Sequence, residues 1–290
     1  VIAVKPGDPA PAGYTLFPRN EYNATLTWEE KAPVSVARYA FDGVEVLDGK
    51  IFFAGGRNGS GYLNTFERYD PSANQWETLT PMTTARSGMA AAVLNGKFYA
   101  IGGQGLSTVE IYDPSTNFWS SGPSLPSEVH HATAIAFNDK IFLIGGRNSS
   151  IQNLNQVLEF NPDTNQWSQK AAMPTARHGL KLVVKGGRIW AIGGFPASAQ
   201  AKVEAYDPAS DSWTSELSLT TARAWSFAWI DRDRIFVAGG ESSQLANQST
   251  NSIESYDPSV NQWIPSGALP EKSYASDAVV IGSKLYFVSG

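Results

Sequence analysis

Short apolar runs alternate with glycine-rich turns along most of this chain. The runs at residues 51–54, 97–101 and 141–144 each end in a Gly-Gly pair. A continuous run of this length favours a strand that is buried on both faces, as between stacked sheets. A turn whose residues adopt positive φ at little cost precedes each run, which predicts a recurring two-stranded hairpin. The expected turns are Asp48-Gly49, Asn95-Gly96, Asn138-Asp139, Gly186-Gly187, Arg232-Asp233 and Gly282-Ser283.

The hairpin belongs to a longer repeat, of which residues 69–103 are one copy. This copy opens with Tyr-Asp-Pro, reaches a tryptophan seven residues after the tyrosine, passes Ala-Arg and ends in Gly-Gly. A fixed spacing requires a fixed backbone path, and a period of 43 to 50 residues predicts the blades of a β-propeller. The spacing of seven holds at Tyr69 and Trp76, Tyr112 and Trp119, Phe160 and Trp167, Tyr206 and Trp213, and Tyr256 and Trp263.

Two further strands are expected after each Gly-Gly loop. The first ends in Tyr-Asp, and an Asp-Pro turn then leads to a strand that carries the tryptophan. Proline suits the second position of such a turn because its φ is already set. A tryptophan ring between neighbouring blades would bury roughly 150–250 Å². We therefore expect these tryptophans to be structural.

Tyr-Asp-Pro, Asn-x-Trp, Ala-Arg and Gly-Gly, in this order, resemble the kelch repeat, and the resemblance covers about residues 28–290. It implies an all-β fold, a six-bladed kelch β-propeller with four antiparallel strands in each blade. We expect a single kelch β-propeller domain over residues 1–290, with residues 1–13 as an arm or linker. Kelch propellers serve as protein-binding modules, sugar-active enzymes and structural discs, so the resemblance leaves the function open.

The last blade is expected to draw on both ends of the chain. Its first hairpin occupies residues 274–290, and no third or fourth strand follows. Strands expected at residues 14–17 and 25–28 would supply them, so that the N-terminal strands close blade six. Closure removes exposed sheet edges, which favour aggregation. The alternative is a chain that is truncated at Gly290.

Composition narrows the classes of function. With 290 residues, 42% of them hydrophobic and 17% charged, the chain suits one large all-β domain. No apolar run is long enough for a transmembrane helix, and a net charge of -5 argues against nucleic-acid binding. The absence of cysteine excludes disulfides, thiolate metal sites and a close relative of galactose oxidase, whose cofactor needs a cysteine joined to a tyrosine.

The cellular location is read from composition alone. Low charge, no cysteine and many Thr, Ser and Asn residues favour an extracellular or periplasmic bacterial protein over a cytoplasmic one. The chain starts at Val1, which indicates a mature protein or an excised domain. We expect a monomeric domain of a larger protein.

Length variation is concentrated in one loop of the repeat. From the second glycine to the tyrosine, or Phe160 in its place, the spacings are 13, 9, 14, 12 and 16 residues. This loop joins the second and third strands of a blade and emerges on the same rim as the connections between blades. Loops on a rigid scaffold commonly carry binding function, so this rim is the expected ligand surface.

Arginine and glutamate recur together in four blades. In the blade of residues 129–167, Val129 and Leu158 replace both. The arginine begins the first strand, the glutamate lies on the third, and Gly-Gly on the second leaves space for a guanidinium to reach the carboxylate as a bidentate pair. We interpret the residues as structural ion pairs rather than an anion-binding crown. They are Arg38 and Glu67, Arg86 and Glu110, Arg177 and Glu204, and Arg223 and Glu254.

Rim residues that do not recur are the binding candidates. In kelch domains that bind acidic peptides, the ligand face is lined by the Arg-Ser-Gly start of the first strand and by the residue after Gly-Gly. This sequence has Arg-Ser-Gly in that form once, at Arg86-Ser87-Gly88. A mixture of Arg, His, Tyr and Trp suits a carboxylate-bearing peptide or a sugar. The candidates are Tyr39, Arg57, Asn58, Ser87, Gln104, His130, His131, Arg147, Asn148, His178, Phe195, Trp225, Glu241 and Tyr274.

We therefore expect a non-catalytic binding module for a protein, a peptide or a glycan, with no cofactor and no metal. Adjacent His130 and His131 would point to opposite faces of a strand, which disfavours a metal site. The first alternative is a carbohydrate-active enzyme similar to the six-bladed kelch sialic-acid mutarotases. In that case the histidines and Arg177 would work with Glu128 or Glu241, although no catalytic motif is present. The second alternative is a structural spacer domain of a larger surface protein.

Overall fold

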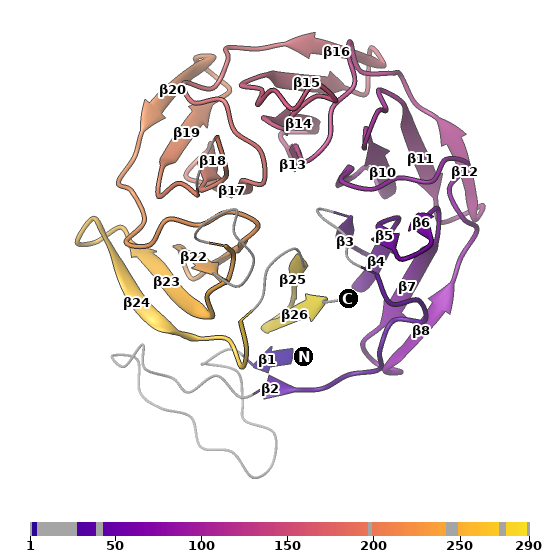
Figure 1. Ribbon diagram of the computed structural model, residues 1–290, viewed down its shortest axis with the longest axis horizontal. Coiled ribbons are helices and arrows are strands. Elements are labelled where there is room, and N and C mark those ends of the chain that lie inside the picture. Colours follow the sequence, from indigo (N-terminus) through magenta and orange to yellow (C-terminus); the bar gives the residue numbers. More distant parts are fainter. Residues whose placement is uncertain are drawn as a thin grey trace.

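The computed structural model describes residues 2–4, 28–38, 43–196, 199–241, 249–272 and 277–288. Every regular element in these ranges is a β-strand, and they hold no helix of the length and apolarity that a membrane crossing needs. The strands form six four-stranded antiparallel sheets and one two-stranded hairpin. The sheets stand side by side in a ring, with the first-numbered strand of most sheets innermost (Figure 1). The fold is an all-β propeller with four-stranded antiparallel blades.

Five sheets are built in chain order, and we call their strands a, b, c and d from the inside outward. Blade one contains β3 (Val44–Leu47), β4 (Lys50–Ala54), β7 (Phe66–Asp70) and β8 (Gln75–Thr78), with the small hairpin of β5 (Arg57–Asn58) and β6 (Gly61–Tyr62) between b and c. Blade two contains β9 (Ala90–Leu94), β10 (Lys97–Ile101), β11 (Val109–Asp113) and β12 (Phe118–Ser121). Blade three contains β13 (Thr133–Phe137), β14 (Lys140–Ile144), β15 (Val157–Asn161) and β16 (Gln166–Gln169). Blade four contains β17 (Lys181–Lys185), β18 (Arg188–Ile192), β19 (Val203–Asp207) and β20 (Ser212–Ser215). Blade five contains β21 (Phe227–Asp231), β22 (Arg234–Ala238), β23 (Ser252–Asp257) and β24 (Gln262–Ala268).

The remaining sheet joins the two ends of the chain. Its order is β2 (Trp28–Glu29), β1 (Ile2–Val4), β26 (Lys284–Val288) and β25 (Asp277–Ile281). The expected third strand at residues 14–17 is wrong, because β1 occupies the place beside β26, with Ala3 opposite Leu285. Part of the expected arm at residues 1–13 is therefore a strand. Because Ile2–Val4 pairs with the backbone groups of β26, residues 14–17 are not needed as the third strand of this sheet. Residues 14–17 lie outside the described residues, and the outer strand begins at Trp28.

The two-residue hairpins between strands a and b are confirmed. In blade two, Leu94 faces Lys97 across the turn, and Asn95 and Gly96 have φ values of 50° and 70°. Positive φ at both central residues matches the right-handed twist of the flanking strands. The other five expected turns have the same two-residue length and at least one residue with positive φ.

Each kelch tryptophan ties its blade to the preceding segment of chain. In blade two, the indole Nε1 of Trp119 donates to the carbonyl of Thr80 at 2.8 Å. The Tyr112 hydroxyl donates to Asn117 Oδ1 at 2.9 Å, and Asn117 has a φ of 56°. The fixed spacing thus places a ring, its polar edge and a left-handed turn residue at one blade junction. Trp76, Trp167, Trp213 and Trp263 make the same indole contact at 2.8–2.9 Å with Ala32, Pro123, Ala171 and Leu217.

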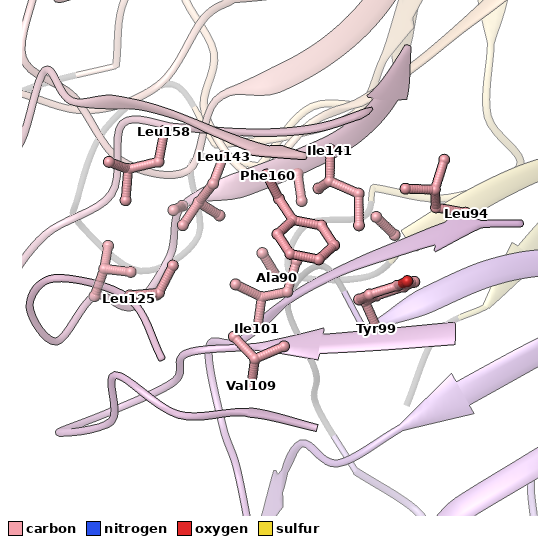
Figure 2. Packing of buried hydrophobic residues seen from close by; sticks show 14 residues of the cluster. Ala90, Leu94, Tyr99, Ile101, Val109, Leu125, Ile141, Leu143, Leu158 and Phe160 are labelled. Atoms are coloured by element: carbon pink, nitrogen blue, oxygen red, sulfur yellow. The ribbon is translucent and has the colours of Figure 1, made fainter. Parts of the chain in front are cut away.

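The core lies between neighbouring blades rather than inside any one of them. Figure 2 shows the cluster that Ile101 and Tyr99 of blade two form with Leu143 and Phe160 of blade three. The rings of Tyr99 and Phe160 have centroids 5.8 Å apart. Around the ring, each inner strand contacts the next, in the cycle β3, β9, β13, β17, β21, β25 and back to β3. Stacked blades of this kind form a rigid support for the loops on the rim.

Candidate functional site

In blades one to four, the Gly-Gly pair fixes the start of a rim loop by bringing one blade against the next. The second glycine donates its N–H to a carbonyl that precedes strand a of the next blade, as Gly146 does to Arg177 at 3.0 Å. The first glycine leaves no room for a side chain, since a Cβ on Gly145 would lie 2.5 Å from the carbonyl oxygen of Arg177. The loop between strands b and c therefore begins at a fixed place beside the following blade.

The recurring arginines contact the recurring glutamates of the same blades, and all eight residues are buried. A second nitrogen of Arg86, Nη1, donates to the carbonyls of Gly102 and Thr108 at 2.7 and 2.8 Å. The guanidinium thus spans strands a, b and c of its blade. The closest nitrogen–oxygen distances are 2.5 Å for Arg38 and Glu67, 2.8 Å for Arg86 and Glu110, 3.1 Å for Arg177 and Glu204, and 2.8 Å for Arg223 and Glu254.

The expected bidentate geometry of these pairs is wrong, because other donors occupy the carboxylates. In blade two, both Nε and Nη2 of Arg86 reach the same oxygen, Glu110 Oε1. The backbone N–H and the hydroxyl of Thr83 both bind the other oxygen, with the N–H at 2.7 Å. Burial alone would raise the pKa of Glu110, but the hydrogen bonds from Thr83 and Arg86 hold it below its usual value.

Sequence reasoning missed these hydroxyl donors, although their signal is present. A serine or threonine stands two or three residues before each of the four arginines, and its hydroxyl binds the paired glutamate. The four residues are Ser35, Thr83, Thr175 and Thr220. With its glutamate and hydroxyl in place, each recurring arginine is already engaged within its own blade.

The structure brings several of the candidate residues together in pairs. The residue after the arginine position forms an antiparallel bridge with the residue after Gly-Gly of the same blade. The pairs are His130 with Arg147, His178 with Phe195, and Ala224 with Glu241. In blade two the matching contact is a single hydrogen bond, from the N–H of Gln104 to the carbonyl of Ser87 at 3.0 Å.

The three histidines of the chain meet two aromatic residues in what we call the aromatic cluster: His130, His131, His178, Phe195 and Trp225. Its ring centroids are 4.9 Å apart for His130 and His131, 4.7 Å for His131 and Trp225, 5.4 Å for His178 and Trp225, and 5.8 Å for His178 and Phe195. The residues come from blades three, four and five. The expectation that adjacent His130 and His131 point to opposite faces of a strand is wrong, because both precede β13 and His131 has a φ of 56°.

A chain of backbone hydrogen bonds holds the base of this cluster. His131 donates its N–H to the carbonyl of Gly88, Gly179 donates to His131, and Trp225 donates to Gly179, at 2.7 to 3.1 Å. All four residues have φ between 53° and 63°, a region that strains residues other than glycine. The large rings lie over the glycines, since a Cβ on Gly88 would come within 2.7 Å of His131 and one on Gly179 within 2.9 Å of Trp225.

Hydrogen bonds set the tautomers of two histidines. Arg147 Nε donates to His130 Nε2 at 3.1 Å, so the ring hydrogen of neutral His130 is on Nδ1. That nitrogen is buried and has no hydrogen-bond partner among the described residues. Asn153 donates its amide N–H to the carbonyl of Pro196, which turns Oδ1 toward His178 Nδ1 at 2.6 Å. His178 therefore donates from Nδ1 and keeps a lone pair on Nε2.

The aromatic cluster is neutral at neutral pH. Burial, followed by the charge of Arg147, lowers the pKa of His130 to about 4. Burial and the same arginine lower the pKa of His178 to about 4. Burial is also the main cause that holds the pKa of His131 well below its usual value. Desolvation disfavours the charged imidazolium, and a nearby guanidinium adds to that effect.

The acidic residues of the rim differ in environment. Glu128 accepts both the N–H and the hydroxyl of Ser149, at 2.9 and 2.6 Å, and these bonds lower its pKa. Burial raises the pKa of Glu241, whose backbone pairs with Ala224 and Ser249. Within the described residues, no three His, Cys, Asp or Glu side chains are grouped as a metal ion would need.

Other candidates lie apart from the aromatic cluster. Arg57 and Asn58 form β5, where Arg57 is exposed and its Cζ lies 5.9 Å from the ring centroid of Tyr62. Asn148 begins the loop of blade three and bonds to Gln152 through its side chain. Tyr39 and Tyr274 lie outside the described residues.

Family models match most of the chain. The model described as the KLHDC2/KLHL20/DRC7 Kelch-repeats domain matches residues 88–290, and the one described as the Kelch motif matches residues 43–83. Among solved structures, the one titled "Structure of YjhT" aligns with a TM-score of 0.73 at 18% identity, over 86% of this chain and 88% of that chain. At that identity the likeness concerns the fold alone.

Curated relatives match over shorter stretches. Kelch-like protein 40 from Xenopus laevis is 42% identical over 76 residues, or 26% of this chain and 12% of that protein. The influenza virus NS1A-binding protein homolog from Mus musculus is 41% identical over 73 residues, or 24% of this chain and 11% of that protein. Kelch-like protein 28 from Homo sapiens is 36% identical over 95 residues, or 30% of this chain and 16% of that protein. The matches thus span less than a fifth of the length of these relatives. Because the repeat models cover most of this chain, the chain belongs to the kelch-repeat family.

Proposed function

We propose that this propeller is a non-catalytic binding module that recognises a carboxylate-bearing protein, peptide or glycan on the rim formed by the b–c loops and the connections between blades. The observation that carries the proposal is the pairing, in blades three and four, of the candidate beside the arginine position with the candidate after Gly-Gly. Side chains from blades three to five converge there in one cluster with Arg147 beside it. Kelch-like relatives support a protein-binding module as the general role.

Charge on the rim supports a ligand that carries a carboxylate. The recurring arginines are each paired with a buried glutamate. Arg57 and Arg147, by contrast, have no carboxylate within 4.0 Å among the described residues. A guanidinium pairs with a carboxylate through parallel hydrogen bonds, so these two residues are the anion-binding groups of the proposal.

The aromatic cluster supplies the second half of the proposed site. Trp225 and His131 are half-buried, while Phe195, which packs beside Trp225, is fully buried. Rings held in this way offer a rigid apolar surface on which a side chain or a sugar ring can stack. His178 Nε2, with its lone pair, can accept a hydrogen bond from a hydroxyl or an N–H of the ligand.

An array of synthetic peptides and glycans, acidic and neutral, tests this function. We expect acidic members to bind and the Arg57→Gln/Arg147→Gln double variant to lose at least about tenfold in affinity. The matched control is Arg68→Gln, because Arg68 lies in strand c of blade one and bridges exposed Glu77. Equal binding by the double variant would overturn the proposal, and no binding at all would favour a spacer domain.

We further propose that the sheet of β2, β1, β26 and β25 is the sixth blade of the ring. Support comes from the contacts of β25 with β21 on one side and with β3 on the other. The proposed blade places the N-terminal strand β1 between β2 and β26. It would complete a closed support for the rim without an exposed inner edge.

A carbohydrate-active enzyme similar to sialic-acid mutarotases is the second candidate. The observation in its favour is a neutral base, His178, on the same rim as Glu241, whose pKa is raised. Anomeric exchange of N-acetylneuraminic acid followed by NMR tests it. Catalysed exchange that is lost in His178→Ala would establish the enzyme. An exchange rate that addition of the protein does not change leaves the binding module.

A further inference from the structure

We propose that the b–c loops of blades one and three are a matched pair of docking loops for a protein segment that carries acidic and large apolar side chains. The first loop spans residues 57–62 and the second spans 147–153. The inference rests on the proposed function and deepens it, because it selects a protein partner and adds an apolar surface outside the aromatic cluster.

The two loops begin with the same four residues, Gly-Gly-Arg-Asn, and no other blade repeats this start. In each loop the asparagine side chain folds back onto the backbone that follows. Asn58 Oδ1 accepts the N–H of Ser60 at 2.9 Å, and Asn148 Oδ1 accepts the N–H of Gln152 at 3.0 Å. The shared start thus builds two short, internally bonded loops on blades that have one blade between them (Figure 1).

Ile151 is placed in solvent at a conformational cost. The residue is 69% exposed, and its φ is 63°, where a β-branched residue is a genuine outlier. The surrounding backbone enforces this geometry, since Ile151 donates its N–H to the carbonyl of Asn148 at 2.9 Å. On the other side of the loop, Ser149 is bound by Glu128. Strain of this kind in a well-bonded loop indicates a function for the side chain it presents.

Tyr62 has the corresponding place in the loop of blade one. It pairs with Arg57 across the β5–β6 hairpin, and it is 47% exposed. The guanidinium of Arg57 lies near its ring, at 5.9 Å from the centroid. A large aromatic residue beside an arginine is a common anchor in protein interfaces.

Charge selects the partner. Each loop combines an exposed apolar side chain with an arginine that has no carboxylate within 4.0 Å among the described residues. A partner that places a carboxylate near a large apolar side chain would satisfy both groups at once. Between the two loops, blade two contributes a shorter loop with exposed Gln104 and Gly105, whose small polar surface leaves the anchors accessible.

Panning a random dodecapeptide phage library on the full chain tests the docking loops. We expect enriched peptides in which an acidic residue lies close to a large apolar one. Synthetic copies should lose about tenfold in affinity for Tyr62→Ser and for Ile151→Ser, and more for the double variant. The matched control is Phe118→Ser, because Phe118 is also 69% exposed but lies at the start of strand d in blade two.

A second variant separates docking from folding. Ile151→Asn should raise the melting temperature by about 2 °C, because asparagine tolerates a left-handed backbone, while peptide affinity still falls.

No enrichment, or peptides that bind the loop variants as they bind the wild type, would overturn the docking loops. If binding is lost in Arg147→Gln or Trp225→Ala but kept in Tyr62→Ser/Ile151→Ser, the proposed function stands and the docking loops fall. If neither peptides nor glycans bind, both fall.

Discussion

The imidazole of His131 meets the indole of Trp225 edge to face, with ring centroids 4.7 Å apart and an angle of 78° between the planes. Blade four stands between the two blades that carry these residues. Both have left-handed backbones, and each ring lies over a glycine of the preceding blade. The contact therefore joins blades three and five across blade four at the base of the proposed ligand surface, and its strain is offset by the hydrogen-bonded chain beneath it.

Stability should depend on pH through the histidines. The pKa values of His130 and His178 are about 4 in the folded chain, against an ordinary value of 6.5 in the unfolded chain. The unfolded state therefore takes up protons first as the pH falls. Stability that is fully present above pH 6.5 should be lost progressively down to about pH 4, at about 1.4 kcal/mol for each unit of pKa depression. Urea denaturation at a series of pH values measures it.

A variant isolates the histidine contribution to this pH dependence. His130→Gln should make the loss of folding stability between pH 6.5 and pH 4 less steep. Arg147 and Glu128 are the charged groups that act on the His130 ring. The variant should not change the loss of stability at lower pH, where groups such as Asp113 become protonated. Hydrogen bonds from Ser115 and Lys97 lower the pKa of Asp113 to about 2. A profile between pH 6.5 and pH 4 that is identical in the variant would contradict the assignment.

Glu110→Gln should destabilise the fold by about 3 kcal/mol, because it leaves the guanidinium of Arg86 buried without a counter-charge. Thermal or urea denaturation gives the change in the free energy of unfolding. The control is Glu77→Gln, which removes an exposed partner of Arg68 and should have no measurable effect. Undiminished stability of Glu110→Gln, or loss of ligand binding by a variant that still folds, would count against a structural role for the pair.

Trp119→Phe should cost about 1 kcal/mol, since the ring stays in place but its hydrogen bond to the carbonyl of Thr80 is lost. Trp119→Ala should cost about 3 kcal/mol or more, because the ring itself is removed from the blade junction. Phe118→Ser is the neighbouring control, as that side chain is mostly in solvent. Equal stabilities of the phenylalanine and alanine variants would show that the ring does not support the junction.

Closure of the ring can be tested with cysteines, because the chain has none of its own. Val4 and Lys284 are opposite each other in β1 and β26. Their Cα separation in an antiparallel pair, about 4.5 to 5.5 Å, is within the range of a disulfide. Val4→Cys/Lys284→Cys should form an intramolecular disulfide under mild oxidation. Val4→Cys/Lys97→Cys, which uses the matching lysine of blade two, should stay reduced, and the reverse outcome would refute the sixth blade.

The regular parts of the repeat could be predicted from sequence, because each rests on a local signal. Turn residues such as Asn95-Gly96 fix the hairpins, and the joint occurrence of Arg86 and Glu110 indicated their contact. The pairing of Ile2–Val4 with β26 could not be predicted, since three residues without the repeat motif do not specify a partner 280 residues away. The contact of His131 with Trp225 was equally hidden, because it depends on left-handed backbones at residues that rarely adopt them.

Imidazole NMR offers the most direct test of the rim as the binding surface, because all three histidines of the chain belong to the aromatic cluster. Long-range ¹H–¹⁵N spectra would be recorded while a peptide selected by panning is titrated to saturation. If the rim binds the ligand, the histidine resonances will shift with the same midpoint as binding, and Arg147→Gln will weaken both together. Saturated binding that leaves all three histidine resonances unmoved would contradict binding at the rim, because the ligand would then lie elsewhere on the propeller.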